Sequence, residues 1–154
     1  CMSAHEIGLI KALEEGNYNY IDRAKLDPRA GLMAAYDADV FLSSANAITD
    51  DGIMVNIDGN SNRVSCIAQG PKKVVFIVGI NKVCSDLDAA MKRARNVAAP
   101  VNAQRFEVKT PCKTTGKCFD CKSPDTICCQ FLITRYSRHT GRIHVILVND
   151  NLGF

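Results

Sequence analysis

The stretch DVFLSSANAITDDGIMVNIDGNSNR, residues 39–63, decides the fold that we expect. It opens on an apolar run of strand length, residues 40–42, and then changes abruptly to small and polar residues. A D-G turn at 51–52 leads into a second apolar run, 53–57, which D-G-N at 58–60 closes. Short buried strands with polar loops at their carboxyl ends are how open α/β sheets build ligand sites. The stretch therefore predicts two strands of an α/β sheet beside a polar pocket.

Strand and helix patterns alternate through the first hundred residues. Residues 73–78, KVVFIV, form a continuous β-branched run that is typical of a parallel strand covered on both faces. The order predicts an α/β fold with a Rossmann-like, mostly parallel sheet flanked by helices. Two β-rich runs near the end, 130–136 and 142–148, are separated by a turn containing Gly141 and predict a C-terminal β-hairpin.

Capping residues and prolines suggest where the helices begin and end. Ser3 and Glu6 predict a capping box at the start of the first helix. Pro100 predicts the end of a helix that begins near Ser85. The basic run at residues 92–95 falls on the solvent-exposed face of that helix, so we interpret its charged side chains as a solvated surface.

Length and composition narrow the classes of function. The 154 residues predict one domain, 1–154, that needs no disulfide to fold. A net charge of +3 is too weak to indicate binding to nucleic acid or to an anionic membrane. The longest apolar run, residues 74–78, is too short to span a bilayer, and no signal peptide is visible.

A polar pocket is predicted where the strands end. Because Asn81 and Lys82 follow the strand at 73–78, they should lie on the same rim as the polar residues after residue 42. Amide and hydroxyl groups there would hold a small anionic ligand, and Arg63 and Lys82 would supply positive charge. The alternative is that these are ordinary turn residues. The candidate ligand-binding residues are Ser44, Asn46, Thr49, Asp50, Asn56, Asp58, Asn60, Arg63, Asn81 and Lys82.

Cysteines gather in one loop, residues 110–129, ahead of the predicted hairpin. Five of the chain's eight cysteines lie between residues 112 and 129, which favours a metal site in a reducing compartment over a disulfide framework. Cys118 and Cys121 form a chelating C-x-x-C pair, with Cys112 upstream and Cys128 downstream. Four thiolates can hold a [4Fe–4S] cluster or a structural zinc. Free thiols, disulfides formed on oxidation and a redox-active C-x-x-C pair remain as alternatives.

The chain as a whole carries a recognisable set of motifs. They are DVFL at 39–42, NAIT at 46–49, VNIDGN at 55–60, GPKK at 70–73, VGINK at 78–82 and TPC at 110–112. The pattern from Cys118 through Ser123-Pro124 to Cys128 follows. In these motifs the sequence resembles the LUD (lactate utilisation) domain family, relatives of the LutC/YkgG proteins. Within the family pattern Cys128, rather than Cys129, corresponds to the fourth cysteine.

The resemblance implies the fold of the NagB, RpiA and CoA-transferase superfamily. It implies a bacterial or archaeal cytoplasmic protein linked to the oxidation of lactate to pyruvate, often within an iron–sulfur complex, but supplies no agreed catalytic residues. Family members usually begin with a further segment, so we expect a truncated member. Part of the pocket would then be absent or completed by a second chain.

Three functions follow from these observations. The first is a component of a 2-hydroxy-acid oxidation system, a subunit of an iron–sulfur lactate oxidoreductase with iron–sulfur partner subunits. The second is a non-redox binding module, or a sugar-phosphate-type enzyme, with a structural zinc. The third is an assembly subunit, and an exposed sheet edge would favour a homo-oligomer. No Ser-His-Asp arrangement can be assigned, because the three histidines lie away from the predicted rim.

Overall fold

Two β-sheets organise the chain, whose residues 1–154 the computed structural model describes. Each sheet belongs to one of two compact units. Unit 1 comprises residues 1–44, 65–80 and 137–153, and unit 2 comprises 45–64, 81–136 and 154. The predicted α/β class is confirmed, whereas a single domain over the whole chain stays a prediction.

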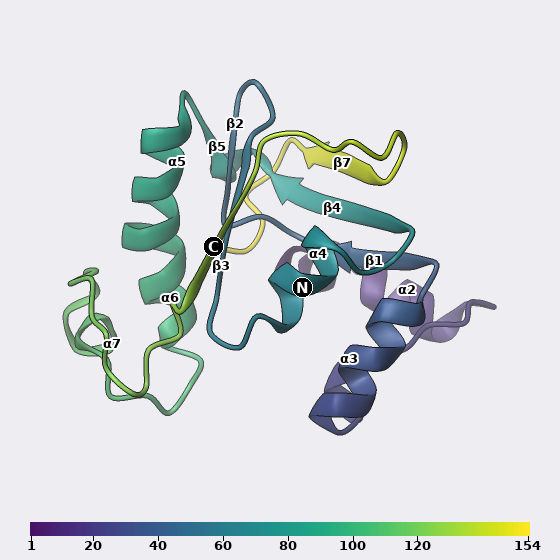
Figure 1. Ribbon diagram of the computed structural model, residues 1–154, viewed down its shortest axis with the longest axis horizontal. Helices are drawn as coiled ribbons and strands as arrows, with labels where there is room; N and C mark the ends of the chain where they lie inside the picture. The colour runs from purple at the N-terminus through teal and green to yellow at the C-terminus, as the bar shows by residue number, and fades with distance from the viewer. The chain divides into compact units, whose positions relative to one another are not determined.

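The sheet of unit 1 is parallel throughout, with strand order β1-β4-β7 (Figure 1). It is formed by β1 (Val40–Ser43), β4 (Lys73–Gly79) and β7 (Ile143–Val148). Phe76 and Ile77 of the central strand are almost completely buried. The strand predicted from the run KVVFIV is therefore confirmed, together with its parallel pairing and burial.

Helices of unit 1 begin and end at places that the sequence marks only in part. They are α1 (Met2–Glu6), α2 (Leu9–Glu15), the short 3₁₀ helix η1 (Arg23–Lys25) and α3 (Pro28–Asp37). The predicted capping box is wrong, because Ser3 lies inside α1 and is buried, and Cys1 is the N-cap residue. Gly8 adopts a left-handed conformation (φ 73°) that separates α1 from α2.

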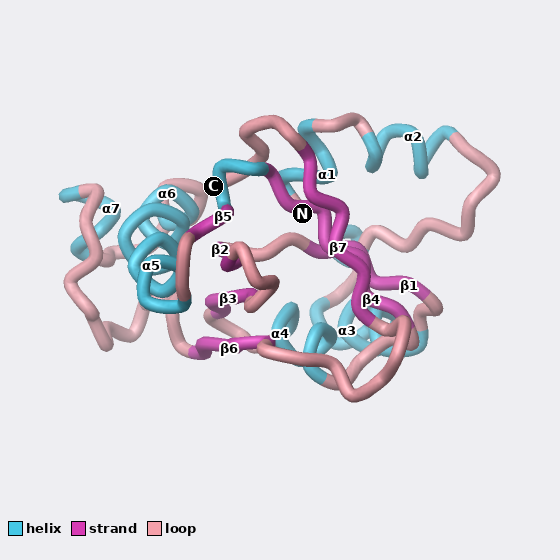
Figure 2. The backbone as a smooth tube through the Cα atoms, turned by 90° about the horizontal axis from the view of Figure 1, so that it is seen from above, coloured by secondary structure: helices cyan, strands magenta, loops and turns pink.

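The sheet of unit 2 is mixed, with strand order β5-β2-β3-β6. Its strands are β2 (Ala47–Thr49), β3 (Met54–Asp58), β5 (Val83–Cys84) and β6 (Gln130–Thr134). The pairs β2–β3 and β3–β6 are antiparallel, and β2–β5 is parallel. Figure 2 shows the four strands as a row with the helices α5 and α6 along one side. Helix α4 (Asn62–Ala68) and the 3₁₀ turn η2 (Ile80–Lys82) lie where the chain passes between the units.

The predicted C-terminal hairpin is wrong. Both β-rich runs are strands, but β6 pairs antiparallel with β3 and β7 pairs parallel with β4. Gly141 does lie in a turn and has φ 71°, yet the strands before and after it enter different sheets. Strand propensity predicts that these runs are extended but not which strands they pair with. The pairing depends on which sheet edge remains open in the folded protein.

One long helical segment packs on the sheet of unit 2. It consists of α5 (Leu87–Arg93), the π-helical turn η3 (Ala94–Ala98) and α6 (Ala99–Ala103). Alanines 90 and 94 contact the buried strand residues Ala47, Val55 and Ile57. None of the helices in the protein has both the length and the apolar character needed to cross a membrane.

The expectation that Pro100 ends this helix is also wrong. Pro100 lies in the first turn of α6, and the segment continues to Ala103. In the π-helical turn the N–H of Ala99 donates to the carbonyl of Ala94, five residues back. Proline is tolerated in the first turn of a helix, where its missing N–H costs little. Because the π-helical turn changes the hydrogen-bond register ahead of Pro100, the helical segment continues past the proline.

Candidate functional site

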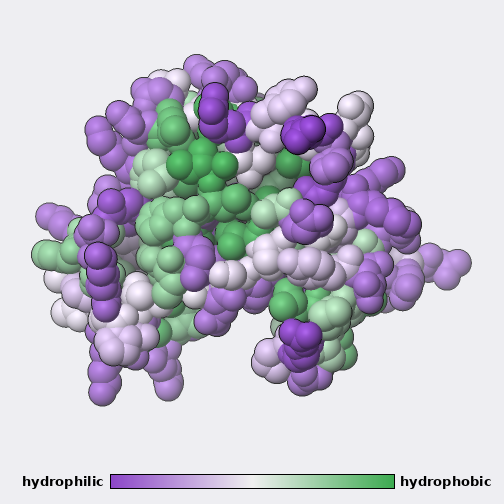
Figure 3. All heavy atoms as spheres, viewed as in Figure 1, coloured by the Kyte–Doolittle hydropathy of each residue, from purple (hydrophilic) through white to green (hydrophobic).

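The cysteine loop starts at a short helix, α7 (Pro111–Thr115). Proline at the first helical position fixes φ in advance and begins the helix, and Gly116 ends it in a left-handed conformation with φ 70°. Cys112 lies in this helix, and its Sγ is 3.3 Å from the Oγ1 of the buried Thr110. Figure 3 shows that mostly hydrophilic and neutral side chains cover the surface over α7. The helix thus presents Cys112 beside a buried hydroxyl group.

The loop after α7 is closed by hydrogen bonds within its own sequence. The N–H of Thr126 donates to the carbonyl of Ser123 (3.0 Å), which forms a turn. The N–H of Lys109 donates to the carboxylate of Asp125 (2.9 Å) and joins the two ends of the loop. These bonds hold residues 110 and 126 near each other although sixteen positions separate them.

Contacts with β3 set the direction of the two last cysteines. The N–H of Cys129 donates to the carbonyl of Asp58 (2.9 Å), immediately ahead of the β3–β6 pairing. A side chain on Gly59 would lie 3.3 Å from the Cα of Ile127, so this glycine permits the close approach of the loop. Cys128 packs against the core of unit 2, whereas Cys129 is exposed. Neighbouring cysteines therefore face opposite ways.

Four cysteines line one cavity of unit 2. They are Cys112, Cys118, Cys121 and Cys128, and Cys129 is not among the lining residues. The hydroxyl-bearing residues Thr110 and Thr126 line the same cavity. All eight cysteines of the chain are free, so no disulfide closes the site.

Hydrogen-bond donors and acceptors surround the thiols. The Cys121 thiol donates to the Oγ1 of Thr126 (3.8 Å), and the same oxygen accepts the N–H of Cys128 (3.3 Å). The guanidinium of Arg95 donates to the Sγ of Cys118 (3.9 Å). Burial, followed by the charges of the neighbouring cysteines, raises the pKa of Cys128 from 9.0 to about 11. The thiol of Cys128 therefore loses its proton less readily than an ordinary cysteine.

A four-thiolate metal group fits these residues in donor type, and the four cysteines border the same cavity. Four sulfur atoms border one cavity, and such donors suit zinc or an iron–sulfur cluster. No three His, Cys, Asp or Glu side chains are arranged as they would be around a metal ion. A metal would therefore have to draw the sulfur atoms towards a common centre.

The raised pKa of Cys128 predicts a loss of stability at alkaline pH in the metal-free protein. The thiol binds its proton more tightly in the folded state than in the unfolded chain, and this difference stabilises the folded state. The stabilisation is fully present below pH 9.0 and is lost as the pH rises towards about 11. We expect the urea midpoint to fall across that interval, and to fall less in Cys128→Ser. Parallel pH profiles for the two proteins would contradict this.

The predicted strand-end residues form an internally bonded network in unit 2. The Oδ1 of Asn46 accepts the N–H of Ile57 (2.8 Å) and the Nη2 of Arg63 (3.0 Å). Arg63 also donates to the carboxylate of Asp58 (3.2 Å) and to the carbonyl of Ile57 (2.7 Å). The Asp58 carboxylate additionally accepts the N–H groups of Arg63 and Val64 at the start of α4. The structure thus brings Asn46, Asp58 and Arg63 together, and the positive charge of Arg63 is balanced by Asp58.

The other predicted ligand-binding residues are placed as follows. The Oγ1 of Thr49 accepts the N–H of Ile53 (2.7 Å), and the N–H of Asp50 donates to the carbonyl of Cys84 (2.9 Å). The Oγ of Ser44 lies in unit 1, 3.3 Å from the Oγ of Ser3. The remaining four are distributed between surface and interior: Asn60 is exposed, Asn81 is half-buried, and Asn56 and Lys82 are buried.

A comparison with known protein families matches the LUD domain over residues 1–148. The chain belongs to the LUD domain family. This family is linked to lactate utilisation. Searches of curated proteins and of solved structures found no significant match.

Two arginines of this LUD domain have roles that the sequence did not indicate. The interpretation of the basic run 92–95 as a solvated surface is wrong for Arg93 and Arg95. Arg93 is half-buried and donates to the carbonyls of Asn46 and Asn81, and burial lowers its pKa. Arg95 bonds the cysteine loop. The partner of Arg95 lies 23 residues later in the chain, so helical spacing alone gave no signal for this contact.

Proposed function

We propose that this LUD domain is a component of a 2-hydroxy-acid oxidation system and that its cysteine loop holds a [4Fe–4S] cluster. The observation that carries the proposal is that Cys112, Cys118, Cys121 and Cys128 line one cavity. The adjacent Cys129 is exposed, which gives a set of four donors rather than five. A cluster, when bound, supplies one-electron transfer.

The residues around the cysteines support a cluster in this place. Thr110 and Thr126 provide hydroxyl groups within hydrogen-bond reach of Cys112 and Cys121. Groups that bond to ligand atoms orient them and adjust the properties of the metal. Such hydrogen bonds, together with net charge and solvent exposure, set the reduction potential of a cluster.

The proposal places electron transfer, rather than substrate binding, at the cysteine loop. The small anionic metabolite would bind elsewhere in the system, either on this chain or on an iron–sulfur partner subunit. The strand-end pocket stays a prediction, and the pairing of Arg63 with Asp58 lowers the charge that Arg63 offers to an anion. A ligand there would bind mainly through amide and hydroxyl groups.

Metal analysis tests the proposal. The protein is purified without oxygen, its absorption spectrum is recorded, and iron, sulfide and zinc are assayed. We expect a broad band near ~400 nm and about four iron and four sulfide per chain. About one zinc per chain without iron would instead support a non-redox module with a structural zinc. The absence of both metals would contradict a metal function for the loop.

A further inference from the structure

Arg95 extends from the helix of unit 2 to the cysteine loop and contacts it at two points. We propose that Arg95 is a positioning residue for Cys118: it holds the sulfur towards the site and supplies the positive charge that favours the reduced form of the bound group. The inference rests on the proposed function for the reduction step, but the positioning of Cys118 applies to any metal bound by the four thiols.

The backbone carries Arg95 on the π-helical turn η3, between α5 and α6. A single π-helical turn inside an α-helix rotates the following side chains relative to the regular spacing, and such turns are frequent at functional sites. The side chain of Arg95 is half-buried, with about 34% of its surface exposed, whereas Lys92 on the preceding turn is exposed. Lys92 and Arg95 border the same hollow beside the loop, but only Arg95 bonds to the loop.

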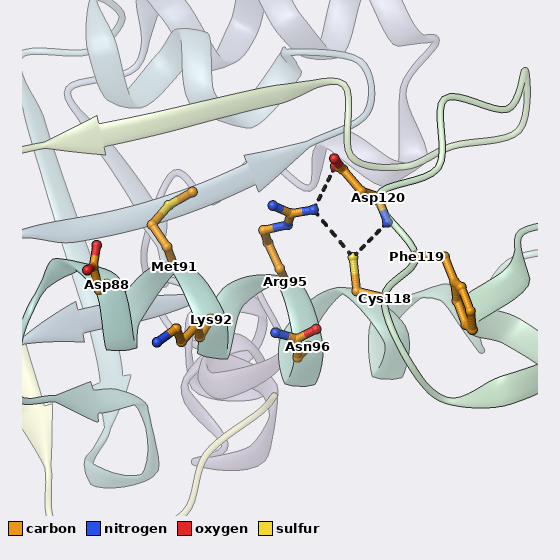
Figure 4. Close-up of a pocket in the computed structure, with 8 residues that line it drawn as sticks. All are labelled: Asp88, Met91, Lys92, Arg95, Asn96, Cys118, Phe119 and Asp120. Carbon is orange, nitrogen blue, oxygen red and sulfur yellow. Dashed lines mark hydrogen bonds and ion pairs between the residues drawn. The ribbon is translucent and has the colours of Figure 1, made fainter.

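Two donors converge on the sulfur of Cys118. The Nη2 of Arg95 is 3.9 Å from this sulfur, and the backbone N–H of Asp120 donates to it at 3.4 Å. The same Nη2 is 2.6 Å from the carboxylate of Asp120. Figure 4 shows the guanidinium between Asp120 and Cys118, with Phe119 on the other side of the loop. Asp120 has φ 51°, a left-handed conformation that aspartate adopts more readily than most residues.

Cys118 differs from the other three cysteines in its surroundings. It borders the four-cysteine cavity and also a second, open hollow of about 500 Å³, which residues of the helical segment and of the loop line together. Arg95 and Asp120 border both spaces as well. Cys112, Cys121 and Cys128 do not line the hollow. All four cysteines are half-buried, but among them only Cys118 borders this open hollow, and Arg95 borders it too.

A guanidinium in this place has two effects on a bound thiolate. A charge-assisted hydrogen bond restricts the position of the sulfur and makes its release to solvent less favourable. Its positive charge, which the exposed carboxylate of Asp120 offsets in part, stabilises the additional electron of a reduced cluster and so raises the reduction potential. Replacing a group that supports a metal ligand typically weakens metal binding by about 10–100-fold. Removal of Arg95 should therefore change metal affinity and reduction potential together.

The test compares Arg95→Gln with Lys92→Gln. Both changes remove one positive charge from the edge of the same hollow, but Lys92 bonds to no cysteine. Cobalt(II) is titrated into the metal-free proteins against a competing chelator, and sulfur-to-cobalt absorption reports the bound thiolates. We expect Arg95→Gln to bind cobalt about tenfold more weakly than the wild type, and Lys92→Gln to bind it equally well.

The second measurement is the midpoint potential of the reconstituted iron–sulfur protein. We expect Arg95→Gln to shift the one-electron equilibrium about tenfold towards the oxidised cluster, which corresponds to about 59 mV. Arg95→Lys keeps the charge but replaces the planar guanidinium, whose Nη2 contacts both Asp120 and Cys118, with a compact ammonium group on a flexible stem. It should restore most of the potential and only part of the cobalt affinity, and it remains informative if Arg95→Gln does not fold.

The outcomes separate this inference from the proposed function. If Arg95→Gln and Lys92→Gln match in cobalt affinity and in potential, the inference is overturned while an iron–sulfur cluster stands. If cobalt binding depends on Arg95 but no iron and sulfide are incorporated, the positioning of Cys118 stands and the proposed function fails. If the wild type does not bind cobalt, the inference is overturned.

Discussion

If the cysteine loop binds the proposed metal, serine in place of Cys128 should remove the metal, whereas serine in place of its neighbour Cys129 should leave it bound. Cys128 lines the cavity with three other cysteines, and Cys129 is exposed with its Sγ 3.5 Å from the carbonyl of Thr126. A serine hydroxyl is a poor ligand for the soft metals that bind four thiolates. We expect metal affinity to fall by more than about 100-fold in Cys128→Ser, since changes beside the ligands alone cost 10–100-fold.

Metal content, measured after anaerobic purification of the two variants in parallel, checks this result. The two changes have the same chemistry at adjacent positions, so a general effect of losing one thiol would appear in both. Thermal unfolding of the metal-free proteins shows whether Cys128→Ser still folds. Equal metal content in the two variants, or a loss confined to Cys129→Ser, would show that the fourth ligand was assigned wrongly.

Asp58→Ala should destabilise the protein by about 2–4 kcal/mol. The carboxylate accepts the N–H groups of Arg63 (2.8 Å) and Val64 (3.0 Å), and it pairs with the Nε of Arg63 at 3.2 Å. The Asp58 side chain is about 11% exposed and that of Arg63 about 25%, so solvent replaces the lost partner only in part. Removing the carboxylate leaves the first N–H groups of α4 and the Nε–H of the largely buried Arg63 without their acceptor, while the Nη2 of Arg63 keeps its bonds to Asn46 and Ile57.

Urea denaturation measures this change, with Asp58→Asn and Asp39→Ala as comparisons. Asparagine keeps an oxygen acceptor but no charge, so about half of the loss should remain in Asp58→Asn. Asp39 pairs with Lys72, but both side chains are more than 80% exposed, so Asp39→Ala should cost less than about 1 kcal/mol. A stability of Asp58→Ala equal to that of Asp39→Ala would count against a structural role for the network.

This network changes how the polar residues of the opening stretch are interpreted. Asn46, Asp58 and Arg63 are polar residues at strand ends, as a ligand pocket requires, and the structure does bring them together. Their hydrogen bonds, however, are made with each other and with the backbone of Ile57. The same residue types serve to bind a ligand or to connect a strand to the following helix. Sequence alone does not distinguish the two uses, because both need polar groups in the same positions.

Local patterns determined a large part of this protein. The β-branched run KVVFIV is the central parallel strand, since a strand that is covered on both faces needs apolar side chains on both. The spacing of Cys112, Cys118, Cys121 and Cys128 marked the four sulfur atoms that border one cavity. Turns, prolines and glycines near each cysteine made a compact loop the expected structure, because they restrict the backbone at fixed positions.

Contacts between distant residues were decided only by the tertiary structure. The runs at 130–134 and 143–148 are strands by composition, yet their partners are β3 and β4, about seventy residues earlier in the chain. Arg95 meets Cys118 because the cysteine loop, which follows 23 residues later in the chain, folds back beside the helical segment that carries Arg95. Pairing and side-chain direction depend on which strand edges and loop surfaces the folded chain leaves beside each other, and no local pattern of residue types encodes that placement.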